Sequence, residues 1–232
     1  IVPAEVLLSD PIGSTWNLHI QPPAWNFVLG SVGAWSPFGL SFSYQVMSLG
    51  LGVLLAATLC ATLGHLGASR RSAVALALLG SLTSQVMVHA FEPRYDLAVA
   101  AMLSSLVWSV ARAGDGSSRG RWPLLGPTIV ATLLVSTRTL YHPVWLAGVV
   151  AIVAWSCRTR ISRRELAAAI LIPVVVVGAI MTKNQIVVGE FTLSTLTGMN
   201  LERSVSPAAS DAALRAMTES GEISDIWDKG LA

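Results

Sequence analysis

Six apolar segments with few or no charges alternate with short polar connections along the chain. They lie at residues 44–67, 73–90, 95–111, 124–137, 143–157 and 166–182. Each is about long enough to cross ~30 Å of hydrocarbon as a helix, although the shortest are at the lower limit. No period-2 alternation of the barrel type is visible, and only helices or closed barrels satisfy their backbone hydrogen bonds in lipid. The pattern therefore predicts an all-α, polytopic bundle of about six membrane-spanning helices.

Arginines are sorted between the two sets of connections that join these segments. Nine follow the first, third and fifth segments: Arg70, Arg71, Arg112, Arg119, Arg121, Arg158, Arg160, Arg163 and Arg164. The connections on the other side hold only Arg94 and Arg138. Short loops rich in Lys and Arg stay on the cytoplasmic side of a membrane, so we expect the nine arginines inside. Both ends of the chain and the remaining polar loops are then expected on the non-cytoplasmic, outer face.

Composition places the chain away from ordinary soluble domains. Apolar residues make up 53%, charged residues only 12%, and the mean hydropathy is +0.63. The net charge of +2 does not indicate nucleic-acid binding, because the basic residues are spread over three membrane-proximal loops without interleaved aromatic residues. Topology and contact with anionic lipid headgroups explain them better. We expect a multi-pass integral protein, most simply of a bacterial plasma membrane, with no nucleic-acid partner.

The pattern divides the chain into three regions. Residues 1–43 are expected to form an outer loop with a short interfacial helix from Ala24 to Trp35, residues 44–182 the bundle, and residues 183–232 an outer loop with an acidic tail. The chain begins at Ile1 rather than Met, so we expect it to be a fragment. Cys60 and Cys157 fall near inner helix ends and indicate neither a disulfide framework nor a metal site.

The first outer loop places an acid, an imidazole and an amide close together. Asp10 and His19 precede the run Gln21-Pro22-Pro23. The two prolines fix φ and push Gln21 out of the helical region, so His19 and Gln21 are expected on a rigid, extended stretch. Such a stretch at the membrane surface suits substrate positioning. Alternatively, Asp10 merely opens a turn before the following proline.

The second outer loop carries Glu92, Arg94, Tyr95 and Asp96 between two spans. Pro93 suits the first helical position, which places Glu92 at the cap and Asp96 about one turn in, on a similar face. The two carboxylates are candidates for joint chemistry. The alternative is that both acids complement the helix dipole and pair with Arg94.

The remaining outer connections supply cations and further polar groups. Arg138 lies close in sequence to Tyr141 and His142, and Lys183 and Asn184 end the last segment. A guanidinium at the membrane surface suits a phosphate oxyanion, because its planar fork donates two hydrogen bonds. Snorkelling of the arginine to lipid phosphates is the alternative.

Three stretches together resemble the polytopic glycosyltransferases of the GT-C superfamily, in particular the protein mannosyltransferase and aminoarabinose transferase group (glycosyltransferase family 39). They are the run from His19 to Asn26 before a short helix and a span, the Tyr95-Asp96 loop, and the run from Thr137 to Pro143. Members typically carry a Lys-Pro-Pro or Gln-Pro-Pro element after the first outer loop. The resemblance implies transfer of a sugar from a polyprenyl-phosphate donor to a glycan, lipid or protein acceptor on the non-cytoplasmic face.

The resemblance also implies roles for the candidate residues. The key acid of the family lies upstream of the Pro-Pro element, and Asp10 is the only acid of this chain between Glu5 and that element. We expect an inverting displacement in which a carboxylate activates or orients the acceptor hydroxyl, and cations stabilise the departing lipid phosphate. The candidate catalytic acids are Asp10, Glu92 and Asp96, and the candidate substrate-binding residues are His19, Gln21, Arg94, Tyr95, Arg138, Tyr141, His142, Lys183 and Asn184. No cofactor is required, although a carboxylate pair could hold a divalent metal.

Two other classes of function remain open from the sequence. A transporter or lipid flippase needs polar groups near the span centres, which here hold mainly Ala, Val, Leu, Ser and Thr apart from Gln85 and Pro173. A non-catalytic membrane subunit would be indifferent to replacement of the outer charged residues.

Overall fold

The computed structural model of the chain describes residues 4–83, 86, 88, 95–115, 123–195 and 219–220. It divides into two units, residues 1–194 and 195–232, and the helices below belong to the first. All regular secondary structure among the described residues is helical, which confirms the predicted all-α class. The helices are α1 (Ala4–Ser9), α2 (Pro11–Asn17), α3 (Ala24–Trp35), α4 (Leu40–His65), α5 (Arg70–Ser81), α7 (Tyr95–Asp115), α8 (Leu125–Thr137), α9 (Pro143–Ser156) and α10 (Arg163–Val188).

Three of these helices are long and apolar enough to cross a membrane. Helices α4 and α10 have 26 residues each, and α7 contributes a 20-residue apolar stretch. At a rise of ~1.5 Å per residue they reach about 30 Å or more, the thickness of the hydrocarbon core. Helices α5, α8 and α9 have 12, 13 and 14 residues and reach only about 20 Å. The helices therefore indicate a bilayer environment, whereas the count of six spans stays a prediction.

Local signals in the sequence account for where the helices begin and end. Ser69 and Ser162 cap α5 and α10 by accepting hydrogen bonds from the backbone N–H groups of Ser72 and Glu165. Helix α10 ends at Val188, and its C-cap is Gly189, whose φ of 79° lies in the left-handed region that favours glycine. The helix predicted from Ala24 to Trp35 is confirmed, because α3 has these bounds, and its interfacial position stays a prediction.

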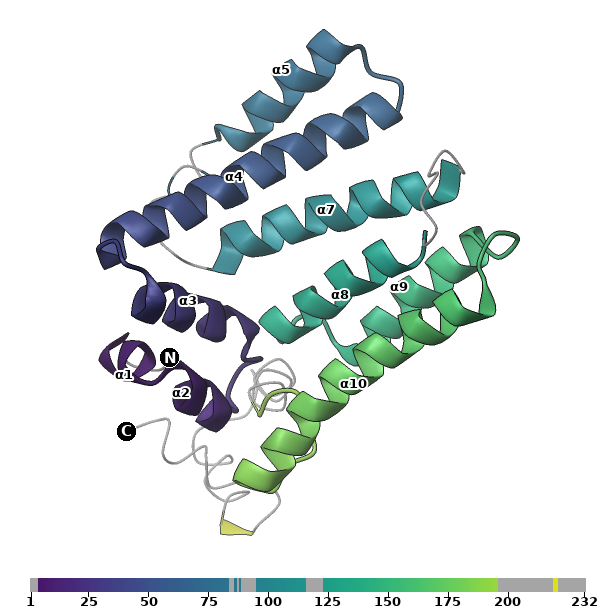
Figure 1. Ribbon diagram of the computed structural model, residues 1–232. Coiled ribbons are helices and arrows are strands. Elements are labelled where there is room, and N and C mark those ends of the chain that lie inside the picture. Colours follow the sequence, from purple (N-terminus) through teal and green to yellow (C-terminus); the bar gives the residue numbers. More distant parts are fainter. Residues whose placement is uncertain are drawn as a thin grey trace. The chain divides into compact units, whose positions relative to one another are not determined.

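The bundle helices run in alternate directions, as the ribbon in Figure 1 makes visible. Helix α4 packs against α5 and α7, α7 against α8, and α8 against α9 and α10. The C-terminal ends of α4, α7 and α9 therefore lie at one end, which we call the arginine-rich end. The N-terminal ends of α7 and α9 and the C-terminal end of α10 lie at the opposite end, where α3 contacts α4 and α8.

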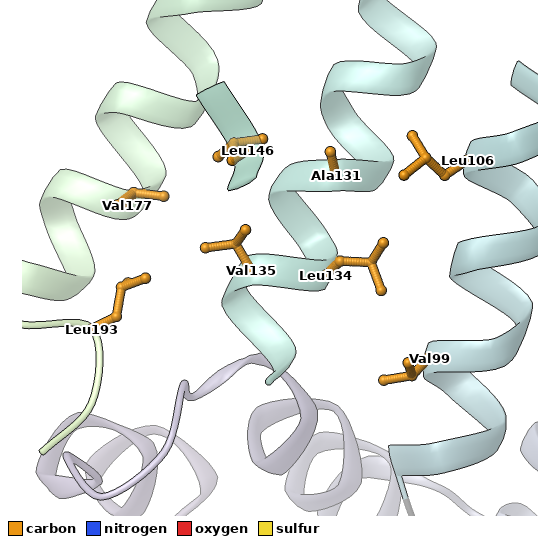
Figure 2. Packing of buried hydrophobic residues seen from close by; sticks show 8 residues of the cluster. All are labelled: Val99, Leu106, Ala131, Leu134, Val135, Leu146, Val177 and Leu193. Atoms are coloured by element: carbon orange, nitrogen blue, oxygen red, sulfur yellow. The ribbon is translucent and has the colours of Figure 1, made fainter. Parts of the chain in front are cut away.

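Helix α8 forms the centre of the hydrophobic core. Ala131, Leu134 and Val135 on this helix are fully buried. In Figure 2, Leu134 extends toward α7, and Val135 lies on the side of Val177 from α10. Only 22% of the apolar stretch of α4 and of α10 is buried, so these two helices expose most of their side chains as lipid-facing helices do. A short apolar helix is thus the most enclosed element of the bundle.

Hydroxyl side chains on α8 are buried without forming a polar path. Thr128, Thr132 and Ser136 are at most 4% exposed. Each donates a hydrogen bond to the carbonyl four residues earlier in the same helix, at 2.8 to 2.9 Å. Because their own backbone satisfies them, these hydroxyls need no partner on a neighbouring helix.

Candidate functional site

Two of the predicted site residues, Asp10 and His19, line one cavity of about 350 Å³. The cavity is formed by α1, α2 and the segment that follows them. Its wall combines a carboxylate, a hydroxyl, an amide and an imidazole with aliphatic side chains. The lining residues are Val6, Asp10, Gly13, Ser14, Asn17, Leu18, His19 and Ile20. The segment that the sequence predicts to be rigid therefore forms a concave polar surface, although the two short helices before it were not predicted.

Asp10 has a structural role as well as a place in the cavity wall. It is the N-cap of α2, and its Oδ1 accepts a hydrogen bond from the backbone N–H of Gly13 at 2.9 Å. A Cβ atom on Gly13 would lie 2.1 Å from Asp10 Oδ2, so a side chain at this position would displace the Asp10 carboxylate. One carboxylate oxygen of Asp10, Oδ1, therefore has the local structural role that the alternative interpretation gave to this residue. The other oxygen, Oδ2, is left for other contacts.

The wall that carries His19 is held by the end of α10. Lys183 donates a hydrogen bond from Nζ to the carbonyl of Leu18, and Ser194 donates one from Oγ to the carbonyl of Ile20. Lys183 is only 7% exposed, so its ammonium is enclosed at this contact. A buried cation needs such partners, because its transfer from water is costly. The lysine predicted to bind phosphate thus also anchors a cavity wall 165 residues away in sequence.

Asn184 stabilises the turn that follows α10. It is 1% exposed and donates from Nδ2 to the carbonyl of Thr192 at 2.7 Å. Its Oδ1 is buried and has no hydrogen-bond partner among the described residues. Asn184, predicted to bind substrate, therefore keeps one acceptor that the described protein groups leave unused.

A second cluster joins three predicted residues from α7 and α8. Arg138, the C-cap residue of α8, places Nη1 3.2 Å from Oδ1 of Asp96 in the first turn of α7. The guanidinium carbon also lies 4.7 Å from the ring centroid of Tyr95. The side chains of Arg138 and Asp96 are 37% and 35% exposed, so the pair is partly accessible. One of the five guanidinium N–H groups takes part in this hydrogen bond, and no described residue outside this pair accepts from the others, so they could bind an anionic ligand.

Tyr141 extends this cluster toward α9. Its backbone N–H donates to the carbonyl of Arg138 at 3.2 Å, and its ring centroid lies 4.9 Å from that of Trp145. Burial raises the pKa of the Tyr141 phenol, and the nearby charge of Arg138 opposes this with a smaller effect. At neutral pH Tyr141 is therefore a neutral hydrogen-bond donor.

His142, predicted to bind substrate, is the N-cap residue of α9. Its Nδ1 accepts from the backbone N–H of Val144 at 3.3 Å, and Pro143 occupies the first position of α9. The order of a capping side chain, proline and an apolar run is a known helix-start signal and was visible in the sequence. Because Nδ1 accepts, the proton of the neutral ring is assigned to Nε2, which is left for other contacts.

The predicted residues thus fall into two groups at one end of the bundle. Asp10 and His19 line the cavity, and Arg138 and Asp96 are not among its lining residues. Gln21 is half-buried next to Pro22, at the end of the segment that forms the wall. Glu92 and Arg94 lie outside the described residues. Within the described part of the chain no group of three or more His, Cys, Asp and Glu side chains could hold a metal ion.

An apolar groove lies between α9 and α10. It has a volume of about 390 Å³, and small side chains on α9 leave room for it. The lining residues are Pro143, Leu146, Ala147, Val150, Ala151, Ala154, Leu166, Ala169, Ile170, Pro173, Val174 and Val177. The spacing of the alanines on α9 at 147, 151 and 154 was a visible signal for one small-residue face.

Comparison of the chain with models of known protein families, with curated proteins and with solved structures found no match.

Proposed function

We propose that the protein is a membrane glycosyltransferase that moves a sugar from a polyprenyl-phosphate donor to a glycan, lipid or protein acceptor. The observation that supports this best is the shared cavity of Asp10 and His19 at the end of a helical bundle with membrane-spanning character. A carboxylate, a hydroxyl and an amide in one wall suit a ligand rich in hydroxyl groups. The volume of about 350 Å³ is in the range of small-molecule sites.

Asp10 is the proposed general base. Its Oδ1 is used by the helix cap, so Oδ2 is the oxygen that takes the proton of the acceptor hydroxyl. The acceptor oxygen forms a bond to the anomeric carbon while the bond from that carbon to the phosphate oxygen breaks. The electron pair of the broken bond leaves with the polyprenyl phosphate. The proposal requires the donor to bind with its anomeric carbon at this cavity.

The cations have two different proposed roles. Arg138 binds the lipid phosphate through N–H groups that Asp96 does not use, and so stabilises the charge that grows on the leaving group. Lys183 acts by holding the cavity wall and by its nearby positive charge. Gln21, Tyr95, Tyr141, Asn184 and Nε2 of His142 are proposed to position sugar or phosphate, and Glu92 and Arg94 stay candidates from the sequence. The active face is proposed to be the non-cytoplasmic side of a bacterial plasma membrane.

Replacement of Asp10 by asparagine tests this proposal most directly. Asparagine also caps helices, so Asp10→Asn preserves the start of α2 but removes the base. We expect the rate of sugar release from a panel of polyprenyl-phosphate hexoses and pentoses, in proteoliposomes with the full chain, to fall at least about 100-fold. Thermal unfolding should be unchanged. The matched control is Glu190→Gln, which converts an exposed carboxylate outside the cavity to an amide. Equal activity in both variants and the parent chain would refute the role of Asp10.

The transporter alternative has no specific observation in its favour. The buried hydroxyls of α8 are bonded within their own helix, and nothing in their geometry favours a polar path along it.

A further inference from the structure

The groove between α9 and α10 lies on a lipid-facing surface of the bundle. Leu166, Ile170 and Val174 in its wall are 38%, 50% and 60% exposed. A concave apolar surface in the hydrocarbon region has no water to fill it, so it is filled by an apolar chain or another protein segment. The nature of its occupant follows from the length of the groove and from the charges at its two ends.

The length of the groove matches one leaflet of a bilayer. It extends from Pro143 to Ala154 on α9 and from Leu166 to Val177 on α10. Either stretch covers about 17 Å at a rise of ~1.5 Å per residue. The hydrocarbon core is ~30 Å thick, so one leaflet contributes about 15 Å. A fatty acyl chain of ordinary length suits this groove, whereas a polyprenyl chain would extend far beyond it.

Among the described residues, exposed positive charge without an ion-pair partner is found at one end of the groove, whereas Lys183, beyond the other end, is buried against the carbonyl of Leu18. Arg158 follows α9, and Arg163 begins α10 one turn before the groove residue Leu166. Both arginines are exposed and form no ion pair among the described residues. The guanidinium of Arg158 lies 4.5 Å from the ring of Trp155, which is 72% exposed, as is typical of residues at the headgroup level.

Glu165, the acid in the first turn of α10, forms no ion pair with these arginines. Glu165 is 1% exposed, and its Oε1 accepts from the backbone N–H of Leu124 instead. At the other end of the groove, Arg138 is paired with Asp96. The charge distribution therefore favours an anionic headgroup at the arginine-rich end.

We propose that this groove binds one acyl chain of an anionic phospholipid, whose phosphate is held by Arg158 and Arg163. The planar guanidinium groups match phosphate oxygens, and the alanines on α9 allow the chain to lie close to the helix. The inference requires a bilayer but does not depend on sugar transfer. The occupant comes from the leaflet at the arginine-rich end.

Lipid binding to the full chain in detergent micelles tests this inference. Native mass spectrometry would compare dioleoyl phosphatidylglycerol with dioleoyl phosphatidylcholine, which share their acyl chains and differ in headgroup charge. We expect phosphatidylglycerol to bind at least about tenfold more tightly, because each arginine near the membrane surface contributes about fivefold. Arg158→Gln combined with Arg163→Gln should abolish this preference. Arg70→Gln combined with Arg71→Gln removes two exposed arginines from the same end, away from the groove, and should preserve it.

A second pair of variants tests the groove itself. Ala151→Phe places a ring in the groove and should weaken binding of both lipids, whereas Ala167→Phe, on an exposed position of α10 outside the groove, should not. Equal binding of the two lipids, or equal loss of preference in the two double-arginine variants, would overturn the inference. The inference would also be overturned if undecaprenyl phosphate displaced the bound lipid and phosphatidylglycerol did not. Loss of sugar transfer in Asp10→Asn leaves these outcomes unaffected, so the two proposals fail separately.

Discussion

The two ends of the bundle use positive charge in opposite ways. Seven arginines with described side chains surround the arginine-rich end: Arg70, Arg71, Arg112, Arg158, Arg160, Arg163 and Arg164. All are exposed, and among the described residues none of them forms an ion pair. At the opposite end Arg138 is paired with Asp96, and Lys183 is buried against the carbonyl of Leu18. Arg160 donates hydrogen bonds to the carbonyls of Ala113 and Gly114, and the other exposed arginines of the first end are available to lipid. The two cations at the second end are fixed by protein groups.

This difference shows what burial requires of a charged side chain. An exposed arginine is solvated by water and headgroups, so it needs no fixed partner and its loss has little effect on folding. A buried or half-buried cation requires compensating groups, and these fix its position to within a hydrogen bond. A fixed position is also what a catalytic or binding group needs. The opposite end is therefore the better candidate for chemistry, although both ends are rich in polar residues.

Removal of a single arginine from each end provides the largest expected contrast. Arg138→Ala should lower the rate of sugar release about 100- to 1,000-fold, because one charge-stabilising donor group is typically worth that much. Arg71→Ala at the arginine-rich end should change the rate less than about twofold. Both rates can be measured in proteoliposomes loaded with polyprenyl-phosphate sugars. Equal rates for the two variants would show that Arg138 does not stabilise the leaving phosphate, although Asp96 holds it in place.

Glu165 tests whether burial, rather than the end of the bundle, is what makes a charged residue important. It lies at the arginine-rich end but is 1% exposed, and its Oε1 accepts from the N–H of Leu124 at 2.6 Å. Glu165→Ala leaves this N–H without a partner and should lower the free energy of unfolding by about 1–3 kcal/mol. Glu165→Gln retains an acceptor oxygen and should cost much less. Urea or thermal unfolding in detergent would measure both variants.

The control for Glu165 is another glutamate with the opposite exposure. Glu190→Ala removes an exposed side chain next to the end of α10 and should change the free energy of unfolding by less than about 0.5 kcal/mol. If Glu165→Ala were as mild as this control, burial would not explain why the two ends differ.

The sequence predicted the helical class, the alternation of polar connections and the bounds of α3 well, because these depend on local composition and periodicity. It did not predict α1 and α2, which have only six and seven residues and leave no clear periodic pattern. The segments that form α8 and α9 are also short, so their sequence does not distinguish a membrane span from a buried helix. Their composition suits both a membrane span and a buried core helix, and α8 is buried.

The candidate site was only partly visible in the sequence. Topology alone places Asp96 and Arg138 at one end, and the structure brings them to 3.2 Å. By contrast, the contact of Lys183 with Leu18 joins residues that are far apart in the chain, and no local pattern indicates which carbonyl a lysine will meet. The cavity and the groove depend on how helices pack, so they could not be predicted from the types of residues that line them.

Ionisation of Tyr141 should have the smallest effect on stability, but it provides the most specific test, because the charge of Arg138 acts on the pKa of this phenol. Burial holds the pKa of the phenol above 10.0, its usual value, in the folded protein. The unfolded chain therefore loses this proton first as pH rises, so folding stability is intact below about pH 10 and falls as pH increases through the folded pKa.

Comparison of unfolding between about pH 8 and pH 11 would isolate this contribution. Tyr141→Phe removes the ionisable group and should flatten the alkaline part of the curve relative to the parent chain. Trp145→Phe alters the neighbouring ring without changing ionisation, so it should shift stability by a similar amount at every pH. Arg138→Gln removes the charge that opposes the effect of burial, and so should steepen the alkaline loss. If stability fell with pH equally steeply in Arg138→Gln and in the parent chain, the guanidinium would not be held close enough to Tyr141 to change its pKa. The two ends of the bundle would then differ only in how exposed their cations are.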